Sequence, residues 1–257
     1  MTSKFVIPKL DYKEKYKMKL QENIVEMKKN MDSKDYIKKV KNFAEKFNID
    51  EQKIIKKYKS DEVFSLFFVK DPLKQSFHEK TAATFIESLN TKLNINMFQN
   101  FQNLPTSGKD ALYVSNGNVI DYNTRQGKSD GKSIDFYWEY QYKNKKIKFY
   151  ASHKYTEVSG GSQDNQRNDV ESFMEGARIN RSNNEMFYAI TDGDYYTDIL
   201  DDLNELHSNS HIKAITINHL AGDVARYIKT WLEKEFGCEV KNEIDKLNTI
   251  INNYNLQ

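Results

Sequence analysis

Two neighbouring segments carry residue types that could hydrolyse a phosphodiester bond with the help of a divalent cation. Asp135 lies in SIDFYWEY, and Ser152 and Lys154 lie in the following KIKFYASHKY. Aspartate oxygens suit a hard cation such as Mg²⁺, which polarises a phosphate and lowers the pKa of bound water. A lysine nearby can orient that water or stabilise the charge that develops on the phosphate. These side chains therefore predict metal-assisted hydrolysis.

Both segments alternate apolar and polar residues, which is typical of β-strands. On the first strand Asp135 is expected on the face opposite Ile134 and Phe136. On the second strand Ser152 and Lys154 share a face. The short connection KNKK favours a hairpin between the two strands, and such pairing would bring the three polar side chains together at one end of a sheet.

This arrangement resembles the PD-(D/E)xK nucleases, specifically type II restriction endonucleases. That family has a helix glutamate, an aspartate on one strand and (D/E)xK on the next. Here Ile134 stands in place of the proline and Ser152 in place of the second acid. A branch that cuts around CCGG uses SxK and carries the missing carboxylate on the following helix, after a glutamine. The run SHKYT, followed by glutamines and DVE, is similar to that branch.

The resemblance implies a role for each residue of the motif. Asp135 would bind Mg²⁺, Lys154 would orient the attacking water, and Ser152 would fill the vacated acid position. Glu79, in FHEKTAATFIESL, would be the helix acid that assists with metal binding.

Two residues compete for the role of the migrated metal ligand. Asp169 lies nearer the apolar face of a helix predicted from Asn168 onwards. Glu171 has the spacing from Gln166 that better matches the branch. Asp169 is preferred by a small margin, and both stay open.

The segment between the lysine and this helix combines a Gly-Gly turn with amides and charges. Gln and Asn side chains can bond adenine, Arg can bond guanine and Asp can accept from cytosine. DNA contacts are therefore expected from Ser162, Gln163, Asp164, Asn165, Gln166 and Arg167. The basic loop over residues 124–132 adds Arg125 and Lys128. Alternatively, the segment is a polar turn that caps the helix at Asn165 or Asn168. The R-x-D-R segment of the CCGG branch is absent, which argues against a CCGG site.

The order of elements predicts how these residues are positioned. Helical periodicity covers residues 11–59, followed by helix, strands, helix, strand, helix, strand and helix. This order predicts an α/β (α+β) fold with a central mixed β-sheet flanked by helices, which the resemblance implies to be restriction-endonuclease-like. A helical basic N-terminal region over 1–65 and a nuclease domain over 66–257 are expected.

Charge is unevenly distributed along the chain. The net charge is only +2, but residues 1–60 hold seventeen lysines and nine acidic residues, a balance of +8, which leaves −6 for the rest. This asymmetry favours a basic face on the N-terminal helices, which could contact DNA or form a dimer surface.

A single cysteine excludes an internal disulfide. No apolar run approaches the roughly 20 residues of a membrane helix, and a cytoplasmic location is expected.

The leading interpretation is a type II restriction endonuclease that cuts double-stranded DNA with Mg²⁺. A palindromic site would imply a homodimer, and a cognate DNA methyltransferase is expected in the same system. One alternative is a non-catalytic DNA-binding protein with a degenerate nuclease fold, suggested by Ser152. Another is a nucleotidyltransferase that uses Asp135 with Glu139, although QGKSDGK is a poor nucleotide-cradling loop.

Overall fold

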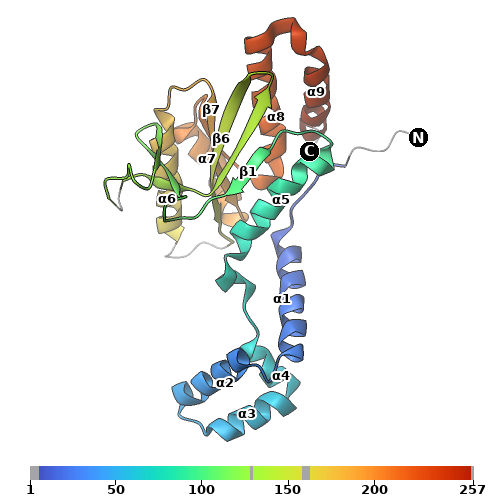
Figure 1. The fold of residues 1–257 in the computed structure, drawn as a ribbon, viewed down its shortest axis with the longest axis vertical. Helices are drawn as coiled ribbons and strands as arrows, with labels where there is room; N and C mark the ends of the chain where they lie inside the picture. The colour runs from blue at the N-terminus through green and yellow to red at the C-terminus, as the bar shows by residue number, and fades with distance from the viewer. Residues whose placement is uncertain (1–5, 128–129, 158–162, 256–257) are drawn as a thin grey trace, which may run out of the picture. The chain divides into compact units, whose positions relative to one another are not determined.

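The computed structural model describes residues 6–127, 130–157 and 163–255, and these form two compact units (Figure 1). The helical unit is Asp11–Thr81. The sheet unit contains the described residues before Asp11 and after Thr81. The helical unit thus continues past residue 65, where the sequence places the boundary.

The helical unit is built from amphipathic helices around a small apolar core. Its elements are α1 (Tyr12–Lys29), α2 (Lys34–Phe47), α3 (Glu51–Ser60), α4 (Glu62–Ser65) and the 3₁₀ turns η1 (Leu66–Phe68) and η2 (Pro72–Gln75). Met27, Val40 and Tyr58 are fully buried in its core. Asp50 caps α3, because its carboxylate accepts a hydrogen bond from the N–H of Lys53 at 2.8 Å. The helices expected over residues 11–59 are confirmed.

After α5, the described part of the sheet unit has a run of strands from β1 to β6 and then alternates helices and strands from α6 to α8. Its elements are α5 (Phe77–Leu93, shared with the helical unit), β1 (Gln99–Asn103), β2 (Leu112–Ser115), β3 (Asn118–Asp121), β4 (Lys132–Ile134), β5 (Phe136–Tyr142), β6 (Lys145–Tyr155), α6 (Gln163–Arg178), β7 (Glu185–Asp192), α7 (Asp194–His207), β8 (Ile212–Ile215), α8 (Ile217–Phe236), η3 (Gly237–Val240) and α9 (Lys241–Asn255). Five strands form a mixed sheet in the order β1-β5-β6-β7-β8. The first two pairings are antiparallel, and β6-β7 and β7-β8 are parallel.

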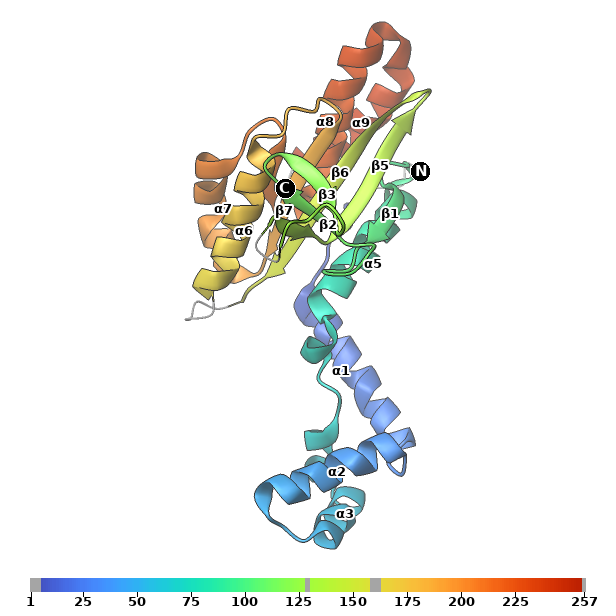
Figure 2. The ribbon, with the colours of Figure 1, turned by 60° about the vertical axis from the view of Figure 1, so that its left-hand side comes forward.

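Helices cover both faces of this sheet, which confirms the predicted fold class (Figure 2). On one face α6 and α7 bury an apolar core that includes Phe173, Tyr150 and Phe187. On the other face the rings of Trp138 and Phe149 stack at 5.3 Å. The ring of Tyr227 on α8 meets that of Phe149 edge-on at 5.9 Å. In the part of the chain that the structure describes, no helix has both the length and the apolar character of a membrane span.

The segment expected to be one strand around Asp135 is divided between two sheets. β4 pairs with β2 in a separate three-stranded sheet, whereas β5 pairs with β6 in the main sheet. The break falls at Asp135, so the expected alternation of faces is wrong across it. Ile134 packs in the α6 core, whereas Trp138 lies in the stack against α8. The antiparallel pairing of β5 with β6 is confirmed.

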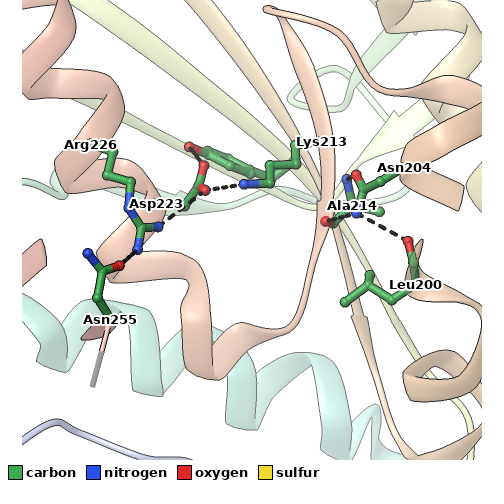
Figure 3. Close-up of polar contacts among 8 residues, drawn as sticks. Leu200, Asn204, Lys213, Ala214, Asp223, Arg226 and Asn255 are labelled. Atoms are coloured by element: carbon green, nitrogen blue, oxygen red, sulfur yellow. Dashed lines mark hydrogen bonds and ion pairs between the residues drawn. The ribbon is translucent and has the colours of Figure 1, made fainter. Parts of the chain in front are cut away.

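Polar side chains complete the edge of the sheet at β8 (Figure 3). The amide of Asn204 on α7 donates to the carbonyl of Ala214 at 2.9 Å and accepts from its N–H at 2.9 Å. On α8, Asp223 pairs with Lys213 of β8 and accepts from the buried hydroxyl of Tyr188 at 3.2 Å. Together these contacts fix β8 between two helices and satisfy outward-facing groups of the edge strand.

Candidate active site

Asp135 lies at the junction of the two sheets. Its N–H donates to the carbonyl of Ala151 and its carbonyl accepts from the N–H of Leu104, both at 2.8 Å. The residue is only 7% exposed. Its carboxylate oxygen Oδ2 accepts from the N–H of His153 at 2.7 Å and from the hydroxyl of Ser152 at 3.2 Å. The strand junction therefore places Asp135 beside the SxK segment, as the sequence predicts.

The surroundings of Asp135 leave its negative charge only partly compensated. Burial raises the pKa of this carboxyl, although the His153 N–H and the charge of Lys154 act in the opposite direction. Among the described residues, no hydrogen bond reaches the second oxygen, Oδ1. A buried carboxylate with an available oxygen favours a cation as a further partner.

Lys154 and Asp169 meet where β6 ends. The ammonium group of Lys154 lies 3.6 Å from Oδ2 of Asp169, and that of Lys132 on β4 lies 2.7 Å from Oδ1. Burial alone would raise the pKa of Asp169, but the two lysines outweigh it and hold that pKa below its usual range. The charge of Lys154 also lowers the pKa of Asp135, so one ammonium acts on both carboxyl groups.

Helix α6 brings Asp169 to this position. Val170, Phe173 and Ala177 are buried in the core against the sheet, as their spacing predicts. Gln166 is hydrogen-bonded to Thr156, which directly follows β6. The first turns of α6 are thus linked to the end of the strand that carries Lys154. The same packing places Asp169 beside that lysine.

Glu171, the other candidate for the migrated acid, has a different partner. Its carboxylate lies 2.7 Å from Nε of Arg167, one turn earlier on α6. The structure thus brings Asp169, and not Glu171, into contact with Lys154. Which of the two binds a metal stays a prediction. Glu79 lies in the first turn of α5, on the part of that helix that belongs to the helical unit, and its role as helix acid also stays a prediction.

The amide-rich segment expected to be a DNA-binding loop is largely helical. Helix α6 begins at Gln163 and not near Asn168, so Asn165, Gln166 and Arg167 lie in its first turns. The alternative of a cap at Asn165 or Asn168 is wrong for the same reason. Predicted contacts at Lys128 and Ser162 fall outside the described residues, as do the side chains of Gln163 and Asp164. The sequence pattern did not predict this helix start, because the contacts of the first turns of α6 with Thr156 and Lys154 are tertiary.

Arg125, a basic residue of the 124–132 loop, contacts β2 and the loop itself. Its guanidinium lies 4.0 Å from the centre of the Tyr113 ring, and its Nε donates to the carbonyl of Asp130 at 2.7 Å. These contacts hold the loop against β2. A phosphate contact by Arg125 stays a prediction.

Three further residues belong to this region, although the sequence did not predict their contacts within it. Lys132 contacts Asp169, as described above. The ring of His153 lies 3.3 Å from Asp192 at the end of β7, and Asp192 accepts from the N–H of Ile217 at the start of α8 at 2.9 Å. The only available signals were the position of His153 within SHK and the strand-ending run TDG.

The donor set fits a Mg²⁺ ion held mainly by water and two carboxylates. Mg²⁺ usually keeps several waters and binds proteins through one or two carboxylates, and Asp135 and Asp169 supply such oxygens. Among the described residues, no group of three His, Cys, Asp or Glu side chains forms a metal site by itself.

Glu139 belongs to another cluster, which weakens the nucleotidyltransferase alternative. Its carboxylate accepts from the hydroxyl of Tyr137 and pairs with Lys146, both at 3.0 Å. Four residues along a strand separate it from Asp135 by roughly 13 Å. The two carboxylates are therefore too far apart to share one metal ion.

Comparisons with protein-family models, with curated proteins and with solved structures found no match to this chain. The arrangement of Asp135, Ser152, Lys154 and Asp169 is therefore the main guide to function.

Proposed function

We propose that this protein is a Mg²⁺-dependent type II restriction endonuclease that hydrolyses double-stranded DNA at a short recognition sequence. One observation carries the proposal: Ser152 contacts Asp135, and Lys154 lies beside Asp169 while its charge also acts on Asp135. Asp135 lies at the β4–β5 junction, Ser152 and Lys154 lie near the end of β6, and Asp169 lies on α6. Such a cluster of carboxylates and a lysine suits phosphodiester hydrolysis.

Each residue of the cluster has a distinct role in this proposal. Asp135 and Asp169 would hold the cation through their oxygens. When bound, Mg²⁺ would polarise the scissile phosphate and lower the pKa of a water molecule. Lys154, whose side chain is 34% exposed, would orient that water and stabilise charge on the phosphate. Ser152 donates to Asp135 and so fixes the orientation of its carboxylate.

The partners follow from the same proposal. Asn165 and Arg167, in the first turns of α6, and Arg125, in the β3–β4 loop, would contact DNA near the cleaved phosphate. A palindromic recognition sequence would require a two-fold homodimer. A DNA methyltransferase of the same specificity would protect the host DNA.

A second candidate is a non-catalytic DNA-binding protein with a degenerate nuclease site. Ser152 occupies the position of an acid, and Asp169 is already paired with two lysines. Such a protein would bind DNA without Mg²⁺ and would cut no plasmid. The experiment below separates the two candidates.

The deciding experiment incubates the purified protein with plasmid and phage DNA and Mg²⁺, and then sequences the DNA ends. The nuclease proposal expects discrete fragments that share one sequence at their ends, and none when EDTA removes the metal.

Lys154→Ala should keep DNA binding in a gel-shift assay but lower the cleavage rate by at least about 100-fold, since general acid–base groups contribute about 10²–10⁴-fold. Unchanged cleavage by Lys154→Ala would exclude this site.

A matched pair of variants tests the choice of acid on α6. Asp169→Asn should abolish cleavage, because it removes a ligand next to Lys154. Glu171→Gln, two residues away and paired with Arg167, should keep most of the activity. The opposite ranking would assign the metal to Glu171.

A further inference from the structure

Lys132 lies outside the nuclease motif but inside the cluster. It is the first residue of β4, which pairs with β2 in the small sheet. Its ammonium is closer to Asp169 than that of Lys154 is, at 2.7 Å against 3.6 Å, and its side chain is 40% exposed. Lys132 thus holds Oδ1 of Asp169 and still faces solvent.

The two lysines compensate the charge of Asp169 before any divalent cation binds. A cation that binds the Asp169 carboxylate must compete with these ammonium groups, because like charges repel at short range. Once the carboxylate binds the cation, it compensates less of the positive charge of Lys132. An anion is then the favourable partner for this lysine, and a DNA phosphate is the anion that the proposed function supplies.

We propose that Lys132 is a DNA-phosphate contact that Asp169 holds in the metal-free protein, so that cation binding and phosphate binding depend on each other. This inference rests on the proposed function. It assigns Lys132 a binding role that a solvent-exposed structural ion pair would lack.

Lys143 provides a matched control. Its ammonium lies 2.7 Å from Glu239, the same distance as in the Lys132–Asp169 pair, and it precedes β6 at the end opposite to Lys154. Lys132→Met and Lys143→Met remove one ammonium each and keep the aliphatic part of the side chain. Lys132→Gln repeats the test with a polar replacement, and thermal melting confirms that each variant is folded.

Two measurements on the whole 257-residue chain test the inference. Calorimetric titration with Mn²⁺ gives the cation affinity without DNA. Fluorescence anisotropy of a labelled mixed-sequence duplex, in Ca²⁺ over a series of salt concentrations, gives the DNA affinity and its salt dependence. Lys132→Met should bind Mn²⁺ about three- to tenfold more tightly, because a repelling charge is gone. Its log–log salt slope should fall by about one, as expected for one lost phosphate contact.

The outcomes distinguish this inference from the proposed function. If Lys132→Met and Lys132→Gln match Lys143→Met in both measurements while the wild-type protein cuts DNA, the phosphate role of Lys132 is wrong and the nuclease proposal stands. If the wild-type protein neither binds Mn²⁺ nor cuts DNA, both fail. A change confined to the Lys132 variants supports the inference.

Discussion

At the scale of single residues, the candidate site is defined by two carboxyl groups in opposite situations. Asp135 is buried and its pKa is raised, so its ionised form is less stable in the fold than in water. Asp169 is held between two lysines and its pKa is lowered. A buried carboxylate that lowers the stability of the fold is typical of functional sites, where a bound cation compensates its negative charge.

This contrast predicts how Asp135→Asn affects stability. Asparagine keeps an oxygen for the His153 N–H but carries no charge, so the variant should be more stable without metal, by about 0.5–2 kcal/mol at neutral pH. Thermal melting in EDTA measures the change. Asp121→Asn is the control, because hydrogen bonds from Thr124 lower the pKa of that exposed carboxyl, and its loss should not stabilise the protein. A lower melting temperature for Asp135→Asn would contradict the expectation.

At the scale of elements, the ends of strands position the candidate site residues, and a side-chain amide hydrogen-bonds to the outer edge of β8. β4 and β5 separate at Asp135, and α6 packs its apolar face so that Asp169 lies at the end of β6. At the edge of the sheet, Asn204 hydrogen-bonds to both backbone groups of Ala214. Its amide replaces the neighbouring strand that β8 lacks on that side, which blocks edge-to-edge association.

Asn204→Ala should therefore destabilise the sheet unit. The N–H and carbonyl of Ala214 would lose their partners in a site where Ala214 is 1% exposed, at a cost of about 1–3 kcal/mol. Urea unfolding gives the free energy. Asn253→Ala is the matched control, because the Asn253 amide donates an exposed hydrogen bond to the carbonyl of Thr249, one turn earlier on α9. Equal losses of unfolding free energy for the two variants would show that the contact of Asn204 with Ala214 contributes no more to stability than an exposed side-chain hydrogen bond.

At the scale of the whole molecule, charge is separated along the chain. The first sixty residues carry +8 and the rest −6, and most of those sixty belong to the helical unit. Lys53 and Lys56 are exposed on α3. Because phosphates attract such groups without regard to sequence, this unit is a candidate for non-specific DNA contact.

The double substitution Lys53→Glu with Lys56→Glu should weaken DNA binding uniformly across sequences and reduce its salt dependence. Each lost phosphate contact lowers the log–log salt slope by about one. Anisotropy titrations of duplexes of different sequence measure the effect. Lys234→Glu with Lys241→Glu makes the same charge change at exposed positions of the sheet unit and is the control. Equal weakening by both variants would indicate a general charge effect and not a surface on the helical unit.

The sequence by itself determined the features that follow from local periodicity. The apolar spacing of Val170 and Phe173 identified the buried face of α6, and alternation in KIKFYASHKY identified β6 with Ser152 and Lys154 on one side. Burial of one face enforces such patterns, so they can be read without a structure. β1 lacks such a pattern and was not predicted, because QNFQN is polar at an exposed edge of the sheet. It also contains Asn100 at a positive φ of 51°.

Only the tertiary structure decided what depends on residues far apart in the chain. The strand break at Asp135 arises because β4 and β5 pair with different partners. The early start of α6 and the contact of Asp169 with Lys154 depend on packing against the end of β6. Lys132 enters the cluster from thirty-seven positions away from Asp169, a separation at which no local pattern connects two residues. Local periodicity therefore determined where most elements form, and long-range packing determined some of their boundaries and which of their polar side chains meet.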